Sequence, residues 1–100
     1  MNREEILRIF DGWELIREYP KSLWEIGLRL KCPKNDYALS IVASKLPNGS
    51  GIDTIEVVLL KKDTLAFRCR HCKYFNNGIE DNVNRDELIK IKKYVERLRR

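Results

Sequence analysis

The most regular hydrophobic pattern in the chain lies between Leu23 and Cys32. Its apolar positions alternate with polar or small ones: Trp24, Ile26, Leu28, Leu30 and Cys32 against Glu25, Gly27, Arg29 and Lys31. A period of two residues predicts a β-strand with one buried face and one solvated face. The turn formers Pro33-Lys34-Asn35-Asp36 follow this strand and predict a tight connection.

Three further segments have the composition of strands. Tyr37–Leu46 is short, apolar and partly β-branched, which predicts a strand, with a helical turn as the alternative. The turn formers of residues 47–51 predict a loop after it. Thr54–Leu60 and Thr64–Arg70 are separated by only three residues, which predicts a hairpin.

An amphipathic helix is predicted at the start of the chain. Asn2 and Glu5 have the spacing of a capping box, and apolar residues then share one helical face: Ile6, Ile9, Phe10 and Trp13. The helix either ends near Asp11 and gives way to a strand over 13–19, or continues to Glu18. The first interpretation is favoured because a glycine such as Gly12 commonly terminates a helix.

A second helix is predicted at the end of the chain, because Asn84 and Glu87 repeat the capping-box spacing. Its apolar stripe consists of Leu88, Ile91, Val95 and Leu98. The order helix, strands, helix with short connections predicts an α+β fold, with a small, mostly antiparallel sheet of three to five strands flanked by the N-terminal and C-terminal helices. A length of 100 residues corresponds to a single domain over 1–100.

Composition narrows the class of protein. The chain is 43% hydrophobic and 35% charged, which is typical of a soluble globular domain, and no apolar run approaches the roughly 18 residues of a membrane span. Its start is too polar for a signal peptide. Three Cys and one His are too few for a disulfide scaffold, so we expect a cytoplasmic protein. Abundant Lys, Arg and Glu without Gln favour a thermophilic source, and seven Asn residues argue against it.

The net charge of +5 is unevenly distributed. Residues 61–75 carry five cations against Asp63, and residues 85–100 carry seven cations against three anions. If these two blocks meet on one face, that face is an anion-binding surface. The alternative is that Lys and Arg only solvate a hairpin and a helix.

Aromatic residues lie next to the first basic block. Cations contact phosphates, and aromatic rings stack on exposed bases. The sequence therefore predicts a non-catalytic nucleic-acid-binding protein that uses a basic hairpin face, extended by the basic C-terminal helix; the expected contacts are Lys61, Lys62, Arg68, Arg70, Lys73 and Tyr74. For Tyr74 and for Phe75 the alternative is a place in the core.

The cysteines lie at the ends of two predicted strands, in Cys69-Arg70-His71-Cys72 and in Cys32-Pro33-Lys34-Asn35. This arrangement resembles an incomplete zinc ribbon in which Asn35 stands where the fourth cysteine belongs. The resemblance implies that Cys32, Cys69 and Cys72 bind Zn²⁺ as thiolates. Two alternatives stay open: Cys32 and Cys69 are core residues, or a disulfide joins Cys69 to Cys72 or to Cys32.

A second resemblance involves Gly51-Ile52-Asp53, the predicted hairpin after it, and the strand ending in Arg68-Cys69-Arg70. From Glu4 to Leu98 this order resembles the restriction-endonuclease-like core of archaeal Holliday-junction resolvases. The resemblance implies that Gly12-Trp13 opens the first strand and that Asp53 binds metal. Arg68 and Arg70 stand where that family has its catalytic Glu-x-Lys, and two guanidinium groups repel Mg²⁺. The implied protein is a relic that binds nucleic acid without cutting it.

Two alternative functions remain. The stripe of the C-terminal helix has coiled-coil spacing and is compatible with a homodimer or another protein-interaction module. A metal-dependent nuclease would need its missing carboxylate from elsewhere, such as Glu56 or Asp36. The motifs of phosphate-binding loops, dinucleotide-binding folds, serine hydrolases and zinc proteases do not occur in the sequence.

Overall fold

The computed structural model describes residues 2–22, 24–45, 52–62, 64–65 and 79–98. Within them the elements follow in the order α1 (Arg3–Ile9), β1 (Glu14–Glu18), β2 (Ile26–Lys31), β3 (Tyr37–Lys45), β4 (Ile52–Lys61), β5 (Thr64–Leu65), β6 (Ile79–Val83) and α2 (Arg85–Glu96). The predicted α+β fold, with an antiparallel sheet flanked by an N-terminal and a C-terminal helix, is confirmed.

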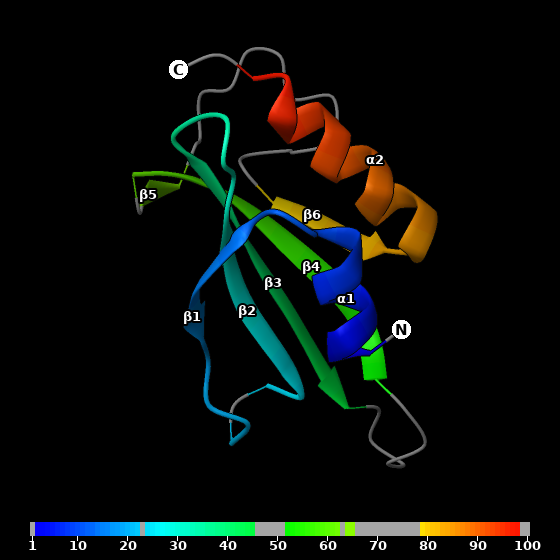
Figure 1. Cartoon of the computed structure of the whole chain (residues 1–100). Helices are drawn as coiled ribbons and strands as arrows, with labels where there is room; N and C mark the ends of the chain where they lie inside the picture. Colours follow the sequence, from blue (N-terminus) through cyan, green and yellow to red (C-terminus); the bar gives the residue numbers. More distant parts are fainter. Residues whose placement is uncertain (1, 23, 46–51, 63, 66–78, 99–100) are drawn as a thin grey trace.

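The strands form one antiparallel sheet in the order β1-β2-β3-β4-β5, with β6 also paired to β4 (Figure 1). β5 pairs with Leu60 and Lys61 at the end of β4, whereas β6 pairs with residues 55–58. The two short strands therefore share one edge of β4, and the six described strands occupy five positions in the sheet.

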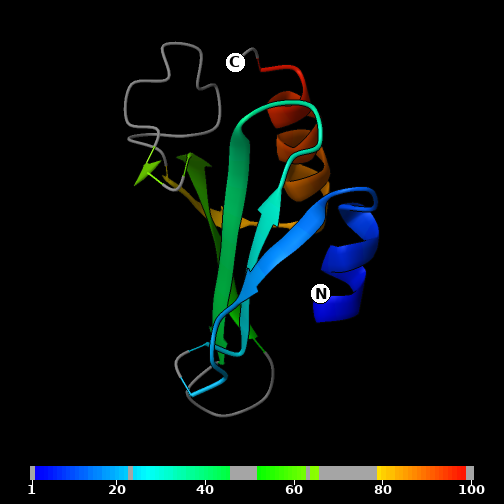
Figure 2. The ribbon, with the colours of Figure 1, turned by 60° about the vertical axis from the view of Figure 1, so that its left-hand side comes forward.

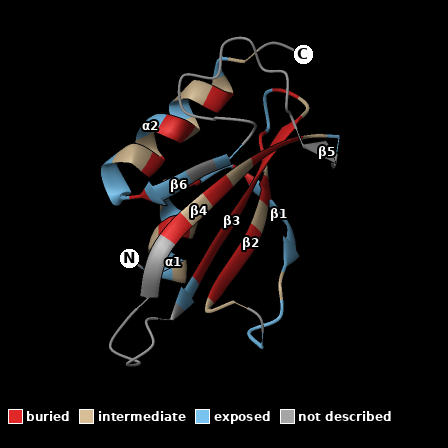
Figure 3. Ribbon diagram, turned by 180° about the vertical axis from the view of Figure 1, so that it is seen from behind, coloured by how far each residue is buried: buried red, intermediate tan, exposed pale blue. Residues whose placement is uncertain are grey.

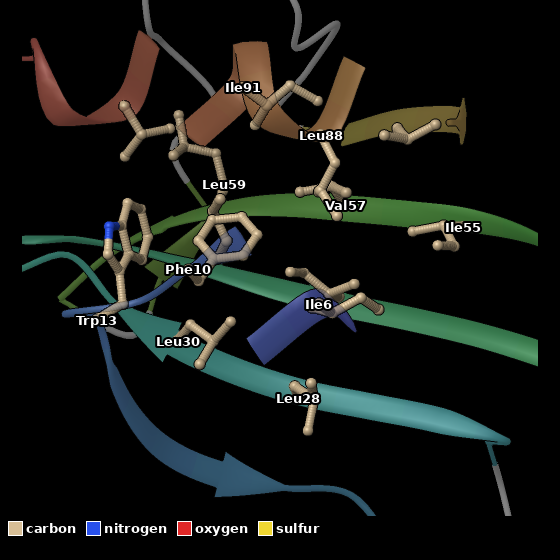
Figure 4. Close-up of a cluster of buried hydrophobic side chains, with 14 of the residues drawn as sticks. Ile6, Phe10, Trp13, Leu28, Leu30, Ile55, Val57, Leu59, Leu88 and Ile91 are labelled. Carbon is tan, nitrogen blue, oxygen red and sulfur yellow. The ribbon is translucent and has the colours of Figure 1, made fainter. Parts of the chain in front are cut away.

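Both helices cover the same face of the sheet (Figures 1 and 2). The period-two pattern puts Ile26, Leu28 and Leu30 of β2 on this face, and all three are buried. Figure 4 shows Ile6 of α1 and Phe10, which directly follows this helix, packed into one cluster with residues of the strands and of α2. Seen from behind, the buried residues follow β2, β3 and β4, while β1 is exposed along its whole length (Figure 3).

The helix boundaries follow the predicted caps. The side-chain oxygen of Asn2 accepts a hydrogen bond from the backbone N–H of Glu5 at 2.9 Å, and Asn84 accepts one from Glu87 at the same distance. α1 ends at Ile9, and Gly12 has a φ of +89° that favours glycine. The favoured early end of the first helix is confirmed, and its continuation to Glu18 is wrong.

The strand predicted from Tyr37 is confirmed as β3, and its alternative, a helical turn, is wrong. Other strands differ from the prediction: the strand expected from Leu23 begins only at Ile26, and the strand expected from Thr54 begins already at Ile52. The sequence does not predict β6, because Asp and Asn residues in its centre disfavour strands. Its pairing with β4 and the burial of Val83 in the core stabilise it. The predicted strand over 64–70 and the predicted turn at 76–78 lie largely outside the described residues.

α2 buries its apolar stripe inside its own domain. Leu88, Ile91 and Val95 are fully buried in the cluster with the sheet and α1. The stripe with coiled-coil spacing is therefore occupied within the chain and is not presented to a second molecule. None of the described helices combines the length and apolar composition needed to cross a membrane.

Candidate nucleic-acid interface

Two of the predicted contact residues, Lys61 and Lys62, lie at the end of β4 and in the turn to β5. The ammonium group of Lys61 is 5.5 Å from the centre of the Tyr37 ring, a cation–π contact. The backbone N–H of Lys62 donates to the carbonyl of Asp36 at 3.4 Å, so this turn adjoins the turn between β2 and β3.

The other predicted contact residues, Arg68, Arg70, Lys73 and Tyr74, lie outside the described residues. Whether they share a face with Lys61 and Lys62 stays a prediction. Lys34 in the adjacent β2–β3 turn is exposed and adds a cation near Lys61 and Lys62.

The candidate metal ligand Cys32 is fully buried in the apolar cluster. Asn35, at the place of a fourth ligand, binds the C-terminal end of α2: its Nδ2 donates to the carbonyls of Val95 at 2.7 Å and Leu98 at 3.1 Å. In the described part of the chain no three His, Cys, Asp or Glu residues form a metal-binding group. Cys69 and Cys72 lie outside it, so the zinc site stays a prediction.

A basic groove of about 500 Å³ lies between α1 and α2. It is lined by Glu5, Arg8 and Ile9 of α1 and by Arg85, Ile89, Lys92 and Lys93 of α2. Helical periodicity explains this set, because residues three or four apart share a helical face. The face of α2 beside its buried stripe therefore turns its side chains toward α1.

The groove carries four cations and one carboxylate, and that carboxylate is already paired. Glu5 Oε2 accepts a hydrogen bond from Arg85 Nε at 2.9 Å. With the residues that the structure describes, Arg8, Lys92 and Lys93 form no ion pair. Three neighbouring cations without a carboxylate produce a positive potential that attracts anions.

The sequence does not predict this groove. The distribution of charge indicates a basic C-terminal helix but gives no sign of Arg8, because residues 1–22 are almost neutral overall. The contribution of Arg8 depends on the packing of α1 beside α2, and neither segment alone carries a signal for that packing.

A second hollow, of about 280 Å³, is lined by Trp24, Val42, Ala43, Ser44, Glu56, Asp81 and Asn82. Burial raises the pKa of Glu56 above its usual value. A hydrogen bond that protonated Glu56 donates to Asp81, and repulsion by the Asp81 carboxylate, raise this pKa further. Asp36 lies far from this pair. It directly precedes Tyr37 on β3, whereas Glu56 pairs with Val42, five residues further along the same strand. Five strand residues span about 17 Å. Glu56 and Asp36 therefore cannot bind the same metal ion.

Comparison with protein-family models, curated proteins and solved structures finds no match to this chain. The resemblances to a zinc ribbon and to a restriction-endonuclease-like core rest on the sequence motifs alone.

Proposed function

We propose that this protein binds nucleic acid without catalysis, through the phosphates, and that the groove between α1 and α2 is its principal contact surface. One observation carries the proposal: Arg8, Lys92 and Lys93 converge there, and no residue in the described part of the chain neutralises them. Binding of phosphates to such cations releases counterions, which favours association.

The groove is suited to this role because its cations are held by two packed helices. Ile9 packs against the hydrophobic core, so α1 and the adjacent Arg8 are fixed relative to α2. The Glu5–Arg85 pair joins the helices at one end of the groove. Lys61 and Lys62, with Arg68, Arg70 and Lys73, are proposed as a second contact, and a cytoplasmic location would give access to nucleic acid.

The proposal is tested by fluorescence anisotropy of labelled DNA and RNA at several salt concentrations. Three phosphate contacts predict that log K falls with log salt with a slope of about −2 to −3. We expect the double variant Arg8→Glu/Lys93→Glu to weaken binding at least about tenfold, because it reverses two of the contacts.

The control is Lys21→Glu/Lys90→Glu, which changes the net charge equally. Lys21 and Lys90 are exposed, and Lys90 is on α2 but does not line the groove. Equal weakening by both variants would show that only net charge matters and would contradict the groove as the contact surface. If Lys61→Glu/Lys62→Glu abolishes binding while the groove variant does not, the hairpin is the interface. Absence of binding to DNA and RNA at low salt would refute the proposed function.

A further inference from the structure

We infer that the groove accepts a single strand of nucleic acid and not a duplex. This inference rests on the proposed function and specifies its ligand. It follows from three properties of the groove: how buried its apolar residues are compared with its cations, how long it is, and where the acidic residues of the two helices lie.

The floor of the groove is apolar, and its rims carry positively charged side chains. Ile9 and Ile89 are half-buried, whereas Arg8, Arg85 and Lys93 are exposed. The two isoleucines are therefore more buried than these three cations, whereas Lys92 is half-buried like the isoleucines. A single strand matches this arrangement, because its phosphates can contact the rims while a sugar or an unpaired base packs on the isoleucines. In a duplex the nucleobases are stacked inside the helix and cannot contact the isoleucines.

The groove is also short. From Arg85 to Lys93 the groove extends about 12 Å along α2, eight residues at 1.5 Å each. This length suits a few nucleotides of one strand.

Acidic residues oppose the alternative in which α2 enters the major groove of a duplex. The first turn of α1 carries Glu4 and Glu5, and the first turn of α2 carries Asp86 and Glu87. Both first turns lie at the same end of the groove, because Glu5 binds Arg85 there. The phosphates that flank an inserted α2 would approach exposed Glu4 and Asp86 and be repelled. A short single strand confined between Arg8, Lys92 and Lys93 avoids them.

The inference is tested with a labelled single-stranded 12-mer, competed by the unlabelled strand and by a blunt duplex of the same sequence. We expect the single strand to compete at least about tenfold better than the duplex at equal nucleotide concentration. We expect little preference among base sequences, because isoleucine side chains offer no hydrogen-bonding groups.

Two variants connect this preference to the groove. Ile89→Ala removes an apolar contact and should weaken single-strand binding several-fold without changing the salt slope, whereas Arg8→Glu/Lys93→Glu should reduce the slope. Ile16→Ala, which shortens an exposed isoleucine on β1, is the matched control and should have no effect. Circular dichroism would verify that the variants are folded.

The outcomes separate the two proposals. A duplex that competes as well as the single strand overturns this inference and leaves phosphate binding by the groove intact. An unchanged affinity of the Ile89→Ala variant also overturns it, because the isoleucine floor of the groove would then not contact the bound strand. If neither single strands nor duplexes bind at low salt, the proposed function itself fails.

Discussion

At the scale of single residues, Tyr19 is fixed on the sheet face opposite the helices. Its backbone N–H donates to the carbonyl of Gly27 at 2.8 Å, and its hydroxyl lies 2.9 Å from Ser40 Oγ. Arg29 Nε donates to the same hydroxyl at 3.1 Å, and the Arg17 guanidinium lies 5.3 Å from the centre of the ring. This residue therefore ties the exposed edge strand to the centre of the sheet.

Gly27 is required for this contact because a side chain there would collide with Tyr19. A Cβ atom on Gly27 would lie 2.8 Å from Tyr19 Cβ and 2.9 Å from its Cδ2. We expect Gly27→Ala to lower the free energy of unfolding by about 1–3 kcal/mol, measured by urea denaturation. In Gly27→Ala/Tyr19→Gly the collision is absent, because glycine has no Cβ atom, so the double variant should lose less than the sum of the single variants. Additive losses would show that Gly27 and Tyr19 do not interact.

The pair of Glu56 and Asp81 makes stability depend on pH. The pKa of Glu56 is raised above its usual 4.5, first by burial and then by Asp81, so the folded protein binds this proton more tightly than the unfolded chain. The contribution of Glu56 to stability therefore falls as the pH rises through its raised pKa. We expect Glu56→Gln to increase the free energy of unfolding at pH 7, where it removes the unfavourable charge, but not at pH 4.

Urea denaturation of the Glu56→Gln variant at both pH values measures this difference, and Asp81→Asn should act in the same direction. Glu14→Gln, on the exposed strand β1, is the control for loss of a negative charge. A gain of the same size at pH 4 and pH 7 would contradict a role for the titration of Glu56.

At the scale of elements, Asn35 connects the β2–β3 turn to the end of α2. Besides its two donated hydrogen bonds to the helix carbonyls, its Oδ1 accepts one from the backbone N–H of Tyr37 at 2.9 Å. The side chain is 3% exposed, so its removal leaves polar groups without partners. We expect Asn35→Ala to lower the free energy of unfolding by about 2–3 kcal/mol. Lys34 is exposed in the same turn, and Lys34→Ala should change the free energy of unfolding by less than about 0.5 kcal/mol. If Asn35→Ala and the unaltered protein unfold at the same urea concentration, this role of Asn35 is wrong.

The elements that could be predicted from the sequence are those specified by local chemistry. Asn2 and Asn84 cap their helices through side chains three residues before the bonded N–H, and the alternation in β2 predicts its buried face. The role of Asn35 could not be predicted, because its partners lie 60 or more residues away in the chain. The same reason applies to the groove, which exists only when Arg8 packs opposite Lys92.

At the scale of the whole molecule, the radius of gyration of 12.9 Å agrees with the roughly 13 Å typical of a single domain of this length. The apolar faces of the sheet and of α2 are closed against each other, and fully buried Leu88, Ile91 and Val95 leave no stripe for a partner helix. Among the residues that the structure describes, the exposed large apolar side chains are Leu15, Ile16 and Ile79. They lie on β1 and β6, away from the proposed coiled-coil surface.

We therefore expect the protein to be a monomer whose urea midpoint does not change over a hundredfold dilution. The stability of a dimer falls on dilution, because dilution favours dissociation into monomers by mass action. Analytical ultracentrifugation over the same concentrations gives the mass directly. A midpoint that moves with concentration would support the homodimer alternative. In that case Ile16→Lys would test whether β1 forms the dimer interface, because loss of the dimer would place the interface there. A register shift between Leu15 and Arg17 already interrupts the regular pairing of this edge strand.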